Sequence, residues 1–190
     1  MAIVIFLGRD VNEYEKEGIE KIKEHIKKGE IRCDICTREL KKHSSYERGI
    51  KETGQRIKIT IMRCKSCNRG HGLLPDFMLP RKHYSGNEIE SVIIDSAASK
   101  TSEIETEASE STARRWIRAI GESIDGAVGI LKYVYMQAGS KISEVYVTAS
   151  TKYGILEQVL EVAPAAIKYS GNKLGLANIW LGKNGRGSYI

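Results

Sequence analysis

One stretch of the sequence decides the fold: IRCDICTRELKKHSSYERGIKETGQRIKITIMRCKSCNRGHGLLPDFM, which covers residues 31–78. It contains all four cysteines of the chain, in two C-x-x-C pairs. Two residues between thiolates let a tight turn direct both sulfurs at one tetrahedral ion, so two such turns supply four ligands and close the site. The spacing predicts one structural Zn²⁺ ion per chain, bound by Cys33, Cys36, Cys64 and Cys67.

A redox role is the alternative interpretation of these cysteines. The apolar run at residues 2–7 is too short for a secretory signal, and nothing approaches the roughly 18 apolar residues of a membrane span. We therefore expect a cytoplasmic protein, and in a reducing compartment cysteine pairs are metal ligands or redox centres more often than disulfides. A thioredoxin-like motif would need a βαβ unit, and neither pair shows one.

A histidine follows the second cysteine pair and competes as a metal ligand. His71 comes four residues after Cys67, in the pattern C-x-x-C-x-x-x-H. Because four thiolates already complete a closed site, we expect His71 to be a hydrogen-bonding or surface residue instead.

The segment between the cysteine pairs has the pattern of a β-hairpin. Residues 44–50 and 56–62 flank a glycine-containing turn at 51–55, and isoleucines alternate with polar residues along the second strand at Ile57, Ile59 and Ile61. We therefore predict a zinc ribbon, in which a hairpin with one apolar and one basic face lies between two metal-binding turns.

Positive charge is concentrated in the same region. Residues 31–84 hold 13 Lys or Arg against 5 Asp or Glu, a net charge of +8, whereas the whole chain has +6. A basic surface on a small module attracts polyanions, most often nucleic acid, although a solvated surface that balances acidic neighbours is the alternative. The residues expected to contact the DNA backbone from the hairpin are Arg48, Lys51, Arg56 and Lys58.

Three helices are expected after the ribbon. Helical spacing of apolar residues indicates helices over 87–98 and 111–120, and Ser102 is a plausible N-cap for a short helix over 103–108. The order of these elements predicts a helix-turn-helix whose third helix enters a major groove.

The third helix has two different faces. Its apolar face is formed by Ala113, Trp116, Ile117 and Ile120, and its opposite face by Ser111, Arg114, Arg115 and Arg118. We expect the second set to contact DNA. The alternative is that the acidic residues of the preceding segment simply pair with these arginines.

The flanking regions are expected to have a structural role. We expect a strand at 4–6 and a helix over 13–28 with Ile19, Ile22 and Ile26 on its buried face. After the third helix, the sequence predicts a longer helix with an apolar stripe (Ile124, Val128, Leu131 and Tyr135), a strand at 146–148, a helix over 151–162 and a glycine-rich end. The C-terminal helices are also expected to form a homodimer face.

The predicted fold class is α+β. Its expected parts are a strand-helix cap (1–30), the zinc ribbon (31–84), the helix-turn-helix (85–120) and a mostly helical C-terminal region (121–190).

The order of motifs also resembles a known family. The C-x-x-C pairs and basic hairpin, with RCKSCNRGHGLLPDFMLPRKHYS and ESTARRWIRAIG, are similar to uncharacterised bacterial zinc-ribbon and helix-turn-helix proteins labelled transposase-like or insertion-sequence-associated. The resemblance extends to MAIVIFLGRD and KLGLANIWLGKNGRGSYI at the two ends. It implies DNA binding in a mobile-element context, and it implies no reaction.

A catalytic centre is not apparent in the sequence. A two-metal strand-transfer site needs three converging carboxylates, and Asp10 is the first candidate, with Asp125, Glu144, Glu157 and Glu161 as downstream partners. No successive strands are evident to hold them, and no Walker-type loop or nucleophile triad is visible.

The sequence thus predicts a non-catalytic zinc protein that binds double-stranded DNA as an accessory or regulatory protein of a mobile element. The alternatives are an adaptor for a transposase or RNA polymerase, and a transposase or nuclease with an unrecognised metal site. Single-stranded RNA binding usually needs exposed aromatic residues among basic ones, and Tyr46 is almost alone in that role.

Overall fold

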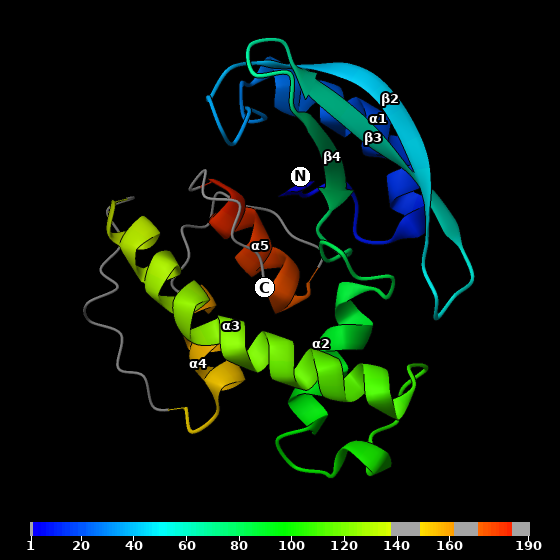
Figure 1. The fold of residues 1–190 in the computed structure, drawn as a ribbon, viewed down its shortest axis with the longest axis vertical. Helices are drawn as coiled ribbons and strands as arrows, with labels where there is room; N and C mark the ends of the chain where they lie inside the picture. The colour runs from blue at the N-terminus through cyan, green and yellow to red at the C-terminus, as the bar shows by residue number, and fades with distance from the viewer. Residues whose placement is uncertain (1, 138–148, 162–170, 184–190) are drawn as a thin grey trace.

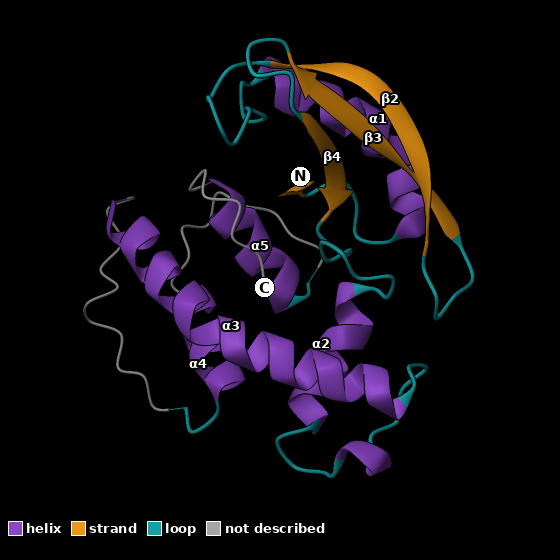
Figure 2. Ribbon diagram, in the orientation of Figure 1, coloured by secondary structure: helices purple, strands orange, loops and turns teal. Residues whose placement is uncertain are grey.

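The computed structural model describes residues 2–137, 149–161 and 171–183. They form an α+β structure in which a four-stranded sheet with one helix adjoins a group of helices (Figures 1 and 2). The strand expected at 146–148 lies outside the described residues, as do Val162, Glu144 and the last residues of the glycine-rich end.

The predicted hairpin is confirmed. Strand β2 (Leu40–Gly49) pairs antiparallel with β3 (Arg56–Cys64), from Leu40 opposite Cys64 to Gly49 opposite Arg56. The basic face is shorter than expected, because Met62 and Cys64, which share the face of Lys58, are buried in the core that also contains residues of the first helix.

Two further strands extend the hairpin into a sheet of order β1-β4-β3-β2. Strand β4 (Gly70–Pro75) pairs antiparallel with β3, and β1 (Ala2–Ile5) pairs parallel with β4. The N-terminal strand therefore shares one sheet with the metal-binding hairpin, an arrangement that strand patterns alone did not predict.

Helix α1 (Val11–Lys27) packs on the sheet through a different face from the one predicted. Ile22 is buried, but Ile19 and Ile26 are 55% and 38% exposed. The buried face instead contains Tyr14, whose ring meets Phe77 edge-on and whose hydroxyl donates to the carbonyl of Lys58 (2.7 Å). Tyr14 combines a buried aromatic ring with a satisfied hydroxyl hydrogen bond on this face.

The start of α1 gives Asp10 a structural role. Its side chain accepts a hydrogen bond from the backbone amide of Glu13 (2.9 Å), so this acid, which we had considered as a catalytic candidate, is the N-cap of α1.

The expected second helix of the helix-turn-helix is absent. After α2 (Gly86–Asp95), the chain forms only a 3₁₀ turn, η1 (Thr101–Glu103), without a side-chain cap. Glu88 explains the difference, because its carboxylate accepts bonds from the Thr106 hydroxyl (2.5 Å) and the Glu107 amide (3.0 Å) and so holds this segment in a non-helical conformation. The helix-turn-helix arrangement is therefore not confirmed.

Helix α3 (Glu110–Gln137) is a single continuous helix. The helix predicted over 111–120 and the longer helix predicted after it are both parts of α3, so the expected boundary at residue 120 falls inside one element. Both predicted apolar stripes are on its packed face, and all but the half-buried Ile117 are buried. Because the second stripe packs within this chain, its residues are not an exposed dimer face.

The remaining helices complete a second core. Helices α4 (Lys152–Glu161) and α5 (Lys173–Lys183) pack with α2 and α3. Helix α5 also contacts the sheet, since Ile179 is buried in the sheet core whereas Trp180 is buried in the helical core, edge-on to Tyr135. Helix α5 thus joins the two cores (Figure 1).

The docking of α5 leads to a first prediction. A Cβ atom at Gly175 would overlap the backbone carbonyl oxygen of Asp76 and the side chain of Asn172. We expect Gly175→Ala to cost about 1–3 kcal/mol of unfolding free energy, because a backbone atom cannot rotate away. Urea unfolding measures the loss. The matched control is Gly129→Ala in α3, where nothing lies within 4 Å of the added methyl, and equal stability of the two variants would contradict the prediction.

Candidate metal centre and basic surface

The two C-x-x-C segments fold into turns of the same geometry. In each turn, the amide of the residue after the second cysteine donates to the carbonyl of the first cysteine (Thr37 to Cys33, 2.8 Å; Asn68 to Cys64, 2.9 Å). These two residues also have the rare positive φ angles of 57° and 60°. The repeated spacing in the sequence therefore corresponds to a repeated backbone structure that points both thiols the same way.

The four sulfur atoms of these turns come together. All four Sγ atoms lie within 4.8 Å of one another. The Cys33–Cys67 and Cys36–Cys64 Sγ distances are 3.5 and 3.4 Å, much longer than the roughly 2.05 Å of a disulfide. They are close to the roughly 3.8 Å edge of a tetrahedron with metal–sulfur bonds of about 2.3 Å.

Backbone amides stabilise thiolates at this centre. The amides of Cys67 and Ser66 bond to the Cys64 sulfur, and the first of these bonds is the main cause that lowers the pKa of Cys64 to about 6. The amides of Arg38 and Arg69 make equivalent bonds that act to lower the pKa values of Cys36 and Cys67, but burial and hydrogen bonds with the neighbouring thiols raise both pKa values overall, that of Cys67 to about 12. A thiolate is the form that binds metal, so this donor set fits an ion held by four cysteines.

His71 lies behind the cysteines in the protein interior. It is fully buried, with Nε2 3.5 Å from the Cys33 sulfur and Nδ1 3.4 Å from an Asp34 carboxylate oxygen. Burial lowers the pKa of His71, and Asp34 opposes that shift. The predicted hydrogen-bonding role fits this geometry, whereas a surface position does not.

Cys33, Asp34 and His71 also form a possible ligand group, because their ligand atoms lie within 4.8 Å of one another. This group shares Cys33 with the four-cysteine set, so it does not constitute an independent site. In the orientation found, His71 supports the Cys33 thiolate as an outer partner.

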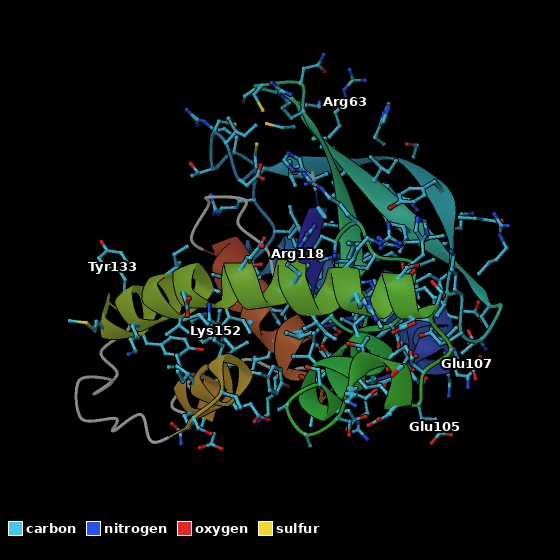
Figure 3. The ribbon with its side chains drawn as sticks, turned by 60° about the horizontal axis from the view of Figure 1, so that its bottom comes forward. Arg63, Glu105, Glu107, Arg118, Tyr133 and Lys152 are labelled. Carbon is cyan, nitrogen blue, oxygen red and sulfur yellow. The ribbon has the colours of Figure 1, made fainter. Side chains whose placement is uncertain are left out.

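A basic surface surrounds the metal end of the sheet. Among the residues that the structure describes, six exposed cations at this end have no acidic side chain within 4.0 Å: Arg38, Lys41, Lys42, Arg63, Lys65 and Arg69. Arg32 is also exposed, but its guanidinium donates to the carbonyls of Gly29 and Thr37. We call these six residues the metal-end cluster. Figure 3 shows Arg63 far from α3, which carries Arg118.

The metal-end cluster was missed as a set of candidate contacts, although its charge was counted. The sequence could have indicated this cluster, because residues next to the metal-binding cysteines in a hairpin must lie at its metal end. Lys41 is directly opposite Arg63 in the β2–β3 ladder, a like-charge pair that is unfavourable without an anion between the two.

Of the hairpin residues predicted to contact DNA, Arg48 is not available. It is only 7% exposed, and its guanidinium donates to the carbonyls of Leu79 (2.8 Å) and Lys82. The prediction that Arg48 holds the DNA backbone is wrong, because its side chain turns inward and fixes the loop that leads to the helices.

The other three predicted hairpin residues are exposed. Arg56 pairs with Glu47 (2.9 Å), Lys51 lies over the ring of Tyr84 (5.7 Å to the centroid), and Lys58 is solvent-exposed. The structure brings them together at the end of the hairpin opposite the cysteines.

The predicted residues of α3 are all exposed in its first turns, namely Ser111, Arg114, Arg115 and Arg118. Arg114 pairs with Glu110 (2.6 Å), one of the preceding acidic residues named by the alternative interpretation, whereas Arg118 approaches Glu122 of α3 (4.0 Å), which that interpretation did not include. Arg115 donates a hydrogen bond to the Thr112 hydroxyl (3.1 Å). Burial of Lys82 lowers the pKa of that lysine, and the positive charge of the nearby Arg115 lowers it further. The arginines are therefore accessible, but two of the three already have acidic neighbours.

Comparison with known proteins adds one match. Residues 33–116 match the family model DUF6431, described as a domain of unknown function. The matched segment begins at the first cysteine and ends at Trp116, so it includes the whole candidate metal centre and the start of α3. No curated protein and no solved structure matches the chain. Within the described residues, no helix has the length and apolar composition needed to cross a membrane.

Proposed function

We propose that this protein binds double-stranded DNA without catalysing a reaction, and that a structural zinc ion held by the four cysteines shapes the surface that contacts phosphates. The metal-end cluster is that surface. The accessory or regulatory role in a mobile genetic element, and with it a cytoplasmic location, is taken from the family resemblance and the sequence.

The absence of acidic partners at the metal-end cluster supports this proposal most directly. Elsewhere in the described part of the chain, some exposed cations, such as Lys23, Arg56 and Arg114, pair with a carboxylate, whereas others, such as Lys16, have none within 4.0 Å but are not grouped with further cations. The six cations of the cluster do not, and two of them are cross-strand neighbours. A phosphate backbone would relieve their repulsion and release counterions.

The zinc ion would contribute by fixing the positions of two arginines of the metal-end cluster. Arg38 and Arg69 follow the two metal-binding turns at equivalent positions, and their amides bond to the sulfurs. A metal ion that holds the thiolates would therefore also fix the backbone positions of Arg38 and Arg69. The arginines of α3, with Ser111, form a second exposed surface that we propose contacts bases.

Removing charge from the metal-end cluster tests the proposal. The double variant Lys41→Gln/Arg63→Gln should weaken binding to specific and scrambled duplexes alike, because phosphate contacts carry no sequence information. The slope of log affinity against log salt should fall by about 2, roughly 1 for each lost contact. Fluorescence anisotropy with labelled duplexes over a range of salt concentrations measures both effects.

The control is Lys16→Gln/Lys100→Gln, which removes the same net charge from one exposed lysine early in α1 and one directly before η1. We expect the control to bind like the wild type. Equal losses in both double variants would show a general charge effect. A wild type that binds no duplex at low salt would refute DNA binding and favour the adaptor alternative.

A further inference from the structure

A groove of about 820 Å³ opens along one face of the sheet. It crosses all four strands and ends at the loop that leads to the helices, with lining residues that include Tyr46, Ile61, Gly70, Gly72 and Arg81. No residue of α1 or of the described part of α5 lines it.

The floor of the groove is low because β4 carries glycines there. Gly70 and Gly72 alternate along the strand and so face the same side, and Gly72 is directly opposite Ile61. Neither glycine has a positive φ angle, and an added Cβ would meet only ordinary contacts at 3.7–3.8 Å. The backbone therefore does not require glycine at either position, and the missing side chains leave open space over the sheet.

An exposed aromatic ring lies beside this floor. Tyr46 is 43% exposed, and its ring atoms would be 3.8 Å from a Cβ at Gly72. The ring thus rests beside the glycine backbone and still offers surface to the groove. Exposed aromatic rings of this kind stack with unpaired bases.

The rim of the groove is basic. Arg56, Arg81 and His83 line it together with the buried Arg48, against a single acid, Glu47. Glu47 is already paired with Arg56. The charge therefore complements an anion.

Arg48 gives this rim a fixed structure. Its guanidinium is bonded to the carbonyls of Leu79 and Lys82, while its buried Nε has no hydrogen-bond partner among the described residues. Arg81 lies between these two clamped carbonyls and adopts a positive φ of 63°, a strained conformation for a residue with a side chain. The clamp holds Arg81 and His83 at the groove.

We propose that this groove binds a single-stranded segment of nucleic acid, with a base stacked on Tyr46 and the phosphates at Arg81 and His83. The proposal rests on the proposed nucleic-acid function and names a second substrate form, unpaired nucleotides, and a second site, distinct from the metal-end cluster. Stacking explains the glycine floor, which a duplex contacted only through its phosphates would not need.

The test uses the full zinc-loaded chain and three labelled probes: an oligothymidylate, an oligouridylate and a mixed-sequence duplex. We expect Tyr46→Ala to weaken binding of the single strands about tenfold and to leave duplex affinity unchanged, and Tyr46→Phe to restore the stacking. Gly70→Val should cause a similar loss by filling the groove, since valine suits a strand. The matched control is Tyr133→Ala, which removes an exposed tyrosine of α3.

Each outcome decides the proposal. Selective loss for single strands in Tyr46→Ala and Gly70→Val, with rescue by Tyr46→Phe, supports it. Unchanged single-strand affinity in those variants, or equal losses on the duplex, overturns it. A wild type that binds the duplex but neither single strand also overturns it and leaves the proposed function standing, whereas binding to no probe removes both. The thymidylate and uridylate probes separate DNA from RNA as the source of the strand.

Discussion

Replacing Cys64 by serine is expected to abolish zinc binding and to unfold the metal end of the sheet. Cys64 is fully buried at the end of β3, where its thiolate faces three other cysteines. Structural zinc sites of small modules contribute about 10–16 kcal/mol of apparent binding free energy, which is folding free energy when the unfolded chain has no site. The segments around both turns contain few apolar residues, so we expect the metal end of the sheet to lose its cooperative structure.

Elemental analysis and amide hydrogen exchange measure this prediction. The wild type should contain one zinc ion per chain, and its chelation should reproduce the exchange pattern of Cys64→Ser. Ser66→Ala, in the same turn, is the control, because it keeps the backbone amide that bonds to Cys64. Zinc retained at one ion per chain with native protection in Cys64→Ser would refute a four-cysteine site, and reversible thiol oxidation in place of zinc would support the redox alternative.

The metal-site residues could be predicted from the sequence because the decisive information is local. Two residues between cysteines determine each turn, and the hairpin between the pairs requires only alternating strands and a glycine-containing turn. The repeated backbone bonds at Thr37 and Asn68 show the same local origin. The fold class and the exposed arginines of α3 followed from similar short-range patterns.

The features that could not be predicted depend on contacts between distant segments. The pairing of β1 with β4 joins residues about 70 positions apart in the chain. Arg48 was assigned to DNA because its charge is visible in the sequence, whereas its acceptors, the carbonyls of Leu79 and Lys82, belong to a distant loop. The short second helix predicted from local propensity does not form, because the Thr106 hydroxyl and the Glu107 amide donate hydrogen bonds to the carboxylate of Glu88 in α2.

Helix α5 was also missed, although a signal for it exists. Its glycines suggested an irregular end, but Leu174, Ala177 and Leu181 recur at helical spacing after Asn172, whose side chain accepts a bond from the Gly175 amide (2.5 Å). Gly175 occupies a helical position because the close packing of α5 against the Asp76 carbonyl leaves no room for a side chain.

Truncating Trp116 is expected to cause the largest loss of stability in the helical core. Trp116 is 4% exposed in α3 and meets the ring of Tyr84 edge-on, with ring centroids 4.9 Å apart. Tyr84 belongs to the segment that connects the sheet to α2, and the ammonium group of Lys51 in the hairpin turn lies over the Tyr84 ring, 5.7 Å from its centroid. The Trp116 ring therefore supports the connection between the two cores as well as α3 itself.

We expect Trp116→Ala to lower the unfolding free energy by about 3–5 kcal/mol, since it leaves a large cavity and removes the aromatic pair. Trp116→Phe should lose less, because a smaller ring keeps part of the contact with Tyr84. Urea unfolding followed by circular dichroism measures both variants, with Tyr133→Ala, which truncates an exposed ring on the same helix, expected to change stability by about 0.5 kcal/mol or less. A loss below about 1 kcal/mol in Trp116→Ala would contradict the packing of α3 against this segment. At a temperature where Trp116→Ala remains folded, we expect its duplex affinity to match that of the wild type. That result would show that the inner face of α3 stabilises the fold, whereas the exposed residues contact DNA.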